Sequence, residues 1–155
     1  MGLGVSAPAL AERPYVKIEK IFGDLVDYDQ KLIEIEGVSV DNTQPGDMLC
    51  LIAAVRLKAD AAPKPPRKDL SRPAFLQFGG VWKPTPRGES GPKGKDLLQT
   101  CGAYLRQDGF NDDLLTALET PGSYYISDWT GSVLQVYAPE RRLAASIRYM
   151  RRNPD

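Results

Sequence analysis

Histidine is absent from this sequence of 155 residues. Its absence excludes catalytic systems in which an imidazole activates a serine or cysteine nucleophile. It also removes the commonest metal ligand and the usual charge switch near neutral pH. The two cysteines, Cys50 and Cys101, cannot complete a four-ligand zinc site of the usual kind on their own. We therefore expect a non-enzymatic protein with no catalytic residues, no metal and no cofactor.

Cysteine itself is scarce, and both cysteines lie among apolar residues. Nothing else in the composition indicates a small secreted scaffold held together by disulfides. The sequence therefore predicts two small buried hydrophobic side chains in a reducing compartment. A disulfide between them is the alternative that the sequence leaves open.

Long hydrophobic runs are missing too, since the longest, residues 48–55, has only the length of a buried strand. The first fourteen residues contain neither the basic start nor the long apolar segment of a signal peptide. These features predict a cytoplasmic protein, with a membrane surface as a further place where it acts.

Net charge is zero, because 20 basic residues balance 20 acidic ones. A strong overall field that would attract nucleic acid or an anionic membrane is therefore excluded. The charge is uneven along the chain, however, because fourteen basic and ten acidic residues follow residue 60. The basic residues concentrate between residues 64 and 95 and at the C-terminus, which predicts one basic side on a neutral molecule.

The apolar pattern predicts an α+β fold with a mostly antiparallel sheet of five to six strands and two to three helices. Strands and helices do not alternate regularly, which disfavours a parallel, doubly wound sheet. Residues 1–13 are expected to form a flexible N-terminal arm. Residues 14–152 are expected to form a single domain with long basic Pro/Gly loops at 61–73 and 84–95.

Each element of this fold has a predicted place in the sequence. Gly37 is expected to form a bulge in the second strand, and the third strand is expected to be central because its apolar run is continuous. Helices are expected to begin near Asp96 and at Asn111, the latter acting as a cap. The last segment, residues 138–155, is predicted as a final helix with Pro139 in its first position, and a strand is the alternative. The predicted strands span residues 15–22, 31–40, 48–58, 74–83, 124–128 and 132–138.

The predicted final helix gathers arginines. At about 100° per residue, Arg141, Arg148 and Arg152 fall on one side of it. A solvated helix surface would explain this arrangement, but so would a site for an anionic surface. The residues that we expect to bind such a surface are Arg141, Arg148, Arg151, Arg152, Lys64, Arg67 and Lys68.

The N-terminal sequence Met-Gly-Leu-Gly-Val-Ser matches the N-myristoylation pattern, with Gly2 as the acceptor. A single myristoyl chain binds a membrane only marginally and needs a second signal. The basic loops and arginines would supply that signal by attracting anionic lipids. The combination is typical of a structural or interaction protein, such as a viral matrix-like or peripheral assembly subunit that docks on a membrane. Its expected partners are other proteins, its own copies and an anionic membrane surface.

Two other patterns fall short of a site. The basic loop at 84–95 precedes a predicted helix but departs from the spacing of a phosphate-binding P-loop. Glu34 and Glu36 share one face of a predicted strand, as paired catalytic carboxylates would. Pairing with the neighbouring Lys17 explains them equally well.

Aromatic and basic residues are interleaved around Trp82, and this favours an alternative function. Trp82 beside Lys83 and Arg87 could stack a base over a basic groove, as oligonucleotide-binding barrels do. The alternative is therefore a small single-stranded nucleic-acid or RNA-binding module, to which the arginine-rich C-terminus would contribute. Zero net charge weighs against it, because a dedicated binder usually has a basic excess.

Overall fold

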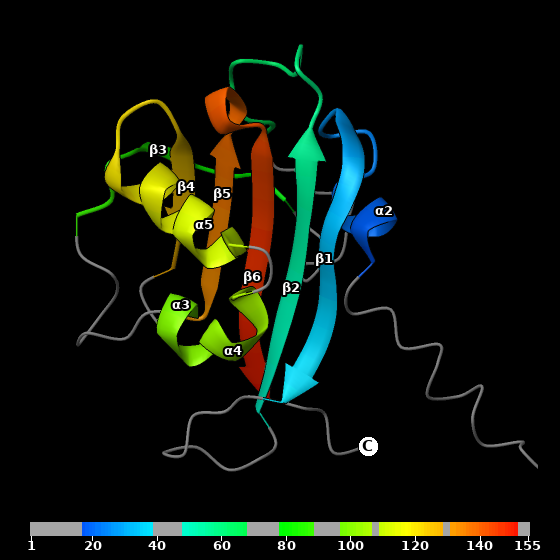
Figure 1. The fold of residues 1–155 in the computed structure, drawn as a ribbon, viewed down its shortest axis with the longest axis vertical. Helices are drawn as coiled ribbons and strands as arrows, with labels where there is room; N and C mark the ends of the chain where they lie inside the picture. Colours follow the sequence, from blue (N-terminus) through cyan, green and yellow to red (C-terminus); the bar gives the residue numbers. More distant parts are fainter. Residues whose placement is uncertain are drawn as a thin grey trace, which may run out of the picture.

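The computed structural model describes residues 17–38, 48–67, 78–88, 97–106, 109–128 and 131–151. They form a single α+β domain around a six-stranded antiparallel sheet, as predicted (Figure 1). The strands lie side by side in the order β1-β2-β6-β5-β4-β3. Their bounds are β1 (Tyr28–Val38), β2 (Met48–Leu57), β3 (Lys83–Pro84), β4 (Tyr124–Ser127), β5 (Val133–Ala138) and β6 (Leu143–Arg151).

One face of the sheet, which we call the helical face, is covered by three short helices (Figure 1). They are α3 (Leu97–Thr100), α4 (Gly102–Leu105) and α5 (Phe110–Glu119). Their buried side chains pack against alternate residues of the central strands, including Ile52 and Ile147. This packing removes one apolar surface of the sheet from water.

The other face, which we call the opposite face, carries a second apolar cluster. It is covered by α2 (Ile18–Ile21) and by the segment that begins with the fully buried Phe78. Because β2 is buried on both faces, its apolar run is continuous rather than alternating. The predicted central position of this strand is confirmed, since β2 lies between β1 and β6.

The strand predicted for residues 15–22 is wrong, because α2 forms within the described part of this range. Ile18, Ile21 and Phe22 are buried together on the opposite face. Their spacing of three and four residues is that of one side of a helix, which the short alternating pattern obscured. A Glu34 carboxylate oxygen on β1 accepts a hydrogen bond of 2.8 Å from the Ile18 N–H, so it satisfies one of the amides that every helix start exposes.

The final helix predicted for residues 138–155 is also wrong over its described part, residues 138–151. A single 3₁₀ turn, η4 (Pro139–Arg141), precedes β6, which pairs with β2 on one side and β5 on the other. The strand alternative is therefore confirmed. Adjacent residues such as Ala144 and Ala145 are both buried, one towards each face. A strand covered on both faces has no polar alternation, so the sequence could not separate it from a helix.

Gly37 does not form the predicted bulge, since it pairs in register with Cys50 and the irregularities of β1 lie nearer its start. Its role is to make room, because a Cβ atom at this position would clash with the ring of Tyr104 on α4. The predicted hairpin is confirmed as β4 and β5, with somewhat shorter strands.

The predicted helices near residues 96 and 111 are present with different boundaries. The first is divided at Cys101 into α3 and α4, and the second is α5. Gly109 rather than Asn111 occupies the cap of α5, with a left-handed backbone at φ 73° that suits glycine. Of the strand predicted for residues 74–83, residues 78–83 are described, and only Lys83 belongs to a strand.

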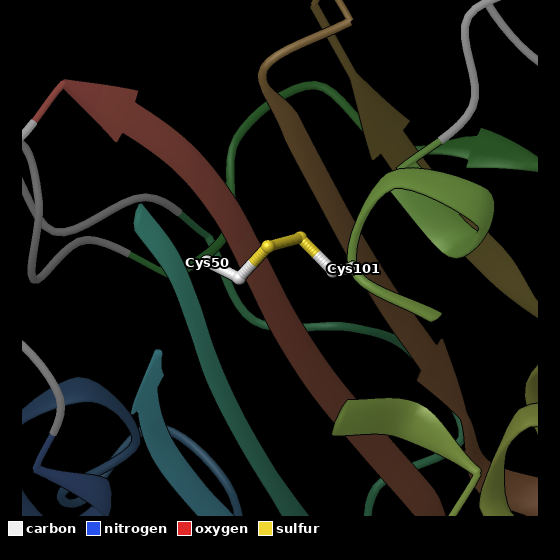
Figure 2. Close-up of a disulfide and its surroundings, with 2 residues drawn as sticks. All are labelled: Cys50 and Cys101. Carbon is white, nitrogen blue, oxygen red and sulfur yellow. A yellow bond between two sulfur atoms is a disulfide. The ribbon is translucent and has the colours of Figure 1, made fainter. Parts of the chain in front are cut away.

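Cys50 of β2 and Cys101 between α3 and α4 are joined by a disulfide (Figure 2). Both residues are fully buried. The prediction of two reduced thiols is therefore wrong, and the alternative that the sequence left open holds. The two cysteines are 51 residues apart in sequence, so only the packing of the helices on the sheet brings them together.

Candidate docking surface

The described part of the basic loop predicted at 61–73 meets residues 78–82, which belong to the strand predicted at 74–83, on the opposite face. The indole Nε1 of Trp82 donates a hydrogen bond of 2.8 Å to the Pro66 carbonyl oxygen. Gly79 has φ 113°, and a Cβ atom there would lie 2.8 Å from the same oxygen. Glycine therefore allows the backbone of residues 78–82 to approach residues 61–67 closely. The described part of the first loop is thus held in place along the sheet.

Tyr137 of β5 gives residues 61–67 a second attachment. Its hydroxyl donates a hydrogen bond of 2.6 Å to the Ala62 carbonyl oxygen. Burial raises the pKa of Tyr137, and the negative charge of Asp27 raises it further. The phenol therefore stays protonated and keeps donating at any pH near neutrality.

A row of aromatic rings supports both segments from below. The Phe78 ring contacts Phe22 at a centroid distance of 4.8 Å and Trp82 at 5.4 Å, both in edge-on geometry. The centroid of the Trp82 ring in turn lies 6.4 Å from that of the Tyr137 ring. Such offset and edge-on pairs are favourable beyond the apolar area they bury. Trp82 is accordingly half-buried, not the exposed residue that base stacking requires.

The side chains around Trp82 face solvent. Lys64, Arg67 and Lys83 are exposed. Val81 is 87% exposed, an unusual position for a large apolar side chain next to two glycines and a buried aromatic row. We call Lys64, Arg67, Val81, Trp82 and Lys83 the basic corner. The sequence predicted its charged members but missed Val81, for which the flanking Gly79–Gly80 pair was the one available signal.

Arg87 lies beyond the basic corner, on a segment fixed against α5. The Arg87 N–H donates a hydrogen bond of 2.6 Å to the Leu118 carbonyl oxygen. The buried Thr85 hydroxyl donates to the Thr120 carbonyl at 2.6 Å and accepts from the Ser123 N–H at 3.0 Å. These bonds fasten β3 to the connection between α5 and β4. The backbone of Arg87 is therefore fixed by α5, whereas the hydrogen bond of Trp82 is to the 61–67 segment.

Among the arginines of the predicted C-terminal surface whose side chains the structure describes, Arg141 and Arg148 do not share a helix face, because they lie on a turn and on a strand. Arg141 is exposed in η4, before β6 begins, whereas Arg148 lies seven residues on within β6 and is half-buried. Burial lowers the pKa of Arg148, and the negative charge of Asp128 offsets this. A strand rises about 3.3 Å per residue, so Arg148 lies well along β6 from the turn that carries Arg141.

Several predicted site residues lie outside the part of the chain that the structure describes. They are Gly2, Lys68 and Arg152, and of Arg151 only the backbone is described. The predicted arm at residues 1–13 lies outside it as well. No statement about their contacts follows from the fold.

The described residues contain no group of three or more Cys, Asp or Glu side chains arranged to hold a metal ion. Within the same residues, no helix has the length and apolar character that a membrane crossing needs. Comparisons of the chain with protein-family models, with curated proteins and with solved structures find no match.

Proposed function

We propose that this protein is a non-enzymatic docking subunit that binds an anionic lipid surface through the basic corner. The observation that supports the proposal is the exposed Val81, which lies next to Trp82 and two residues before the exposed Lys83, on the segment that Trp82 ties to the loop carrying the exposed Lys64 and Arg67. An apolar side chain next to cations is the combination by which interfacial segments bind anionic membranes.

The expected strength is modest. Each basic residue close to an anionic leaflet contributes about 1 kcal/mol, and this contribution falls off within a Debye length. One valine adds the transfer of a single small side chain to the interface. Three basic residues and one valine therefore give a reversible contact, which assembly with other copies or with partner proteins would strengthen through multivalency.

Myristoylation of Gly2 would add affinity for the membrane. However, myristoylation and the disulfide are typical of different cellular compartments. N-myristoylation belongs to proteins made in the cytoplasm, where thiols stay reduced. The Cys50–Cys101 disulfide favours an oxidising compartment. We therefore propose the basic corner, not the lipid, as the principal contact. An intact mass measured with and without reductant reports both modifications on the same molecule.

The nucleic-acid alternative has less support. Base stacking needs an accessible aromatic face, and the Trp82 ring already packs against Phe78 and Tyr137. The two arginines that were to add charge, Arg141 and Arg148, do not lie together. The vesicle experiment therefore includes single-stranded RNA as a competing ligand class.

Sedimentation with vesicles tests the proposal. We expect the protein to bind vesicles that contain phosphatidylserine, to bind phosphatidylcholine vesicles far less, and to dissociate as salt is raised. The variant K64E/R67E should weaken binding more than tenfold, and Val81→Asp should weaken it at unchanged charge on the neighbouring bases. The matched control K17E/R106E reverses two exposed basic residues elsewhere and should bind nearly as well as the wild type.

Three results would overturn the proposal. Equal binding to neutral and anionic vesicles would remove the role of charge. An equal loss in K64E/R67E and K17E/R106E would show dependence on net charge rather than on this corner. Binding of single-stranded RNA, with no affinity for either vesicle, would transfer the function to the alternative class.

A further inference from the structure

A second site lies on the helical face, away from the basic corner. A hollow of about 290 Å³ opens between α5, η4 and the ends of β2 and β6. The hollow is lined by Arg56, Asp113, Glu140, Arg141 and Leu143.

The turn that carries Glu140 and Arg141 is fixed by the next residue, Arg142. Arg142 has the left-handed backbone conformation, φ 55° and ψ 51°, which is uncommon for a residue with a side chain. Its Nε donates a hydrogen bond of 2.8 Å to the Leu57 carbonyl oxygen, and its Nη2 contacts an Asp29 carboxylate oxygen at 3.0 Å. Arg142 therefore ties the turn to β2 and β1 and leaves Glu140 and Arg141 to face the hollow.

The remaining lining residues are also set on regular elements. Arg56 of β2 pairs in register with Leu143 of β6, so both belong to the sheet. Asp113 lies in the first turn of α5. The Arg141 Nη2 atom is 3.5 Å from the Thr120 hydroxyl oxygen at the other end of α5. The four charged side chains thus come from three elements, β2, α5 and η4.

The charges in this hollow are balanced but do not neutralise one another. Arg56 and Arg141 are cations, and Asp113 and Glu140 are anions. Within the described part of the chain, these four side chains form no ion pair of 4 Å or less. A simple anion in the hollow would meet two carboxylates, and a simple cation would meet two guanidinium groups. A ligand that carries both charges can satisfy all four.

We propose that the hollow binds a small zwitterion of the α-amino-acid class. The ligand carboxylate would face Arg56 and Arg141, and its ammonium group would face Asp113 and Glu140. The volume lies at the lower limit for small-molecule sites, which fits a ligand the size of one amino acid. Leu143 provides a single apolar wall, so a small aliphatic side chain suits the site better than a long charged one. This proposal concerns a different face and does not depend on membrane docking.

Nuclear magnetic resonance titration of the whole protein tests the proposal, with alanine as the zwitterion and with acetate and methylammonium as single-charge probes. We expect alanine in the millimolar range to shift the backbone amide signals of Arg56, Asp113 and Leu143 to saturation. Acetate and methylammonium at the same concentrations should not saturate these signals. Arg141→Gln and Glu140→Gln should each weaken alanine binding about tenfold or more, because each removes a charge-assisted hydrogen bond.

The matched control is Arg106→Gln, which removes an exposed arginine from the end of α4 and should leave alanine binding unchanged. Because Glu140 and Arg141 are exposed, their variants are expected to fold, and an unchanged spectrum outside the hollow verifies this. The proposal is overturned if alanine produces no saturable shift, if acetate alone reproduces its effect, or if Arg141→Gln binds alanine as the wild type does.

Discussion

The indole N–H of Trp82 and the carbonyl oxygen of Pro66 form a hydrogen bond that joins two segments of the chain, 61–67 and 78–88. The first segment was predicted as part of a basic loop, and the second as the end of a strand followed by another basic loop. The bond lies over a row of packed aromatic rings, so it is partly shielded from water. It thereby sets the spacing between Lys64 and Arg67 on one segment and Val81 and Lys83 on the other.

Trp82→Phe is expected to remove this bond while keeping an aromatic ring in the cluster. The Pro66 carbonyl then loses a partner, at a cost of about 1 kcal/mol in the free energy of unfolding. Affinity for anionic vesicles should fall although no charge has changed, because the two segments are no longer held together. Chemical denaturation and vesicle sedimentation measure the two effects. Tyr125→Phe, on the other side of the sheet, is the control, and it should change neither the free energy of unfolding nor the affinity for vesicles. If Trp82→Phe binds vesicles as strongly as the wild type does, the hydrogen bond does not organise the basic corner.

The disulfide supports a prediction about stability. Because Cys50 and Cys101 close a long loop, the double variant C50A/C101A should lose about 4 kcal/mol in the free energy of unfolding, or somewhat less if its unfolded state stays compact. The wild-type protein, unfolded without reductant, should react with no thiol-alkylating reagent. The double variant should still fold, because the apolar contacts of the helical face remain. One or two alkylated cysteines in the wild type would contradict the assignment.

The elements that the sequence predicted well have a single clear pattern. The apolar run of β2 has few polar residues and is bounded by turn residues, so its extent and central position followed directly from the sequence. The hairpin of β4 and β5 has turn residues between two short, mainly apolar stretches, which define it locally. In both cases the short-range signal and the tertiary environment agree.

The secondary-structure predictions were wrong where contacts in the folded protein, and not the local sequence, decide between helix and strand. Leu143 to Met150 could be a helix or a strand by periodicity, and pairing on both sides with β2 and β5 makes it a strand. This one change places Arg141 on a turn and Arg148 within a strand instead of on one helix face. The basic corner and the hollow each combine residues far apart in sequence, such as Arg56 and Arg141. No local motif can reveal such a site, because the contacts that build it exist only in the folded sheet.

Tyr137 provides a prediction about pH. Its pKa is raised in the folded protein, so the native state keeps a proton that the unfolded state has lost above about pH 10. The stability from this group is therefore fully present below the unfolded pKa and is lost as pH rises through the folded one. Tyr137→Phe should be less stable than the wild type at pH 8, by about 1 kcal/mol for the lost bond to Ala62, and the difference should shrink as pH rises towards 11. Denaturation curves at each pH measure this difference, and a constant value would contradict the prediction.

At Arg142, the contributions of the backbone conformation and of the side chain to stability can be measured separately. Arg142→Gly loses the side-chain bonds to Leu57 and Asp29 but adopts the left-handed conformation without strain, so its stability should stay within about 1 kcal/mol of the wild type. Arg142→Ala loses the same bonds and keeps the strain, so it should be less stable than Arg142→Gly by about 1 kcal/mol. Asp29→Asn removes only a half-exposed ion pair and should cost less than about 1 kcal/mol. If alanine and glycine at position 142 give equal stability by denaturation, the turn does not hold a left-handed backbone. The firm placement of Glu140 and Arg141 would then be lost as well.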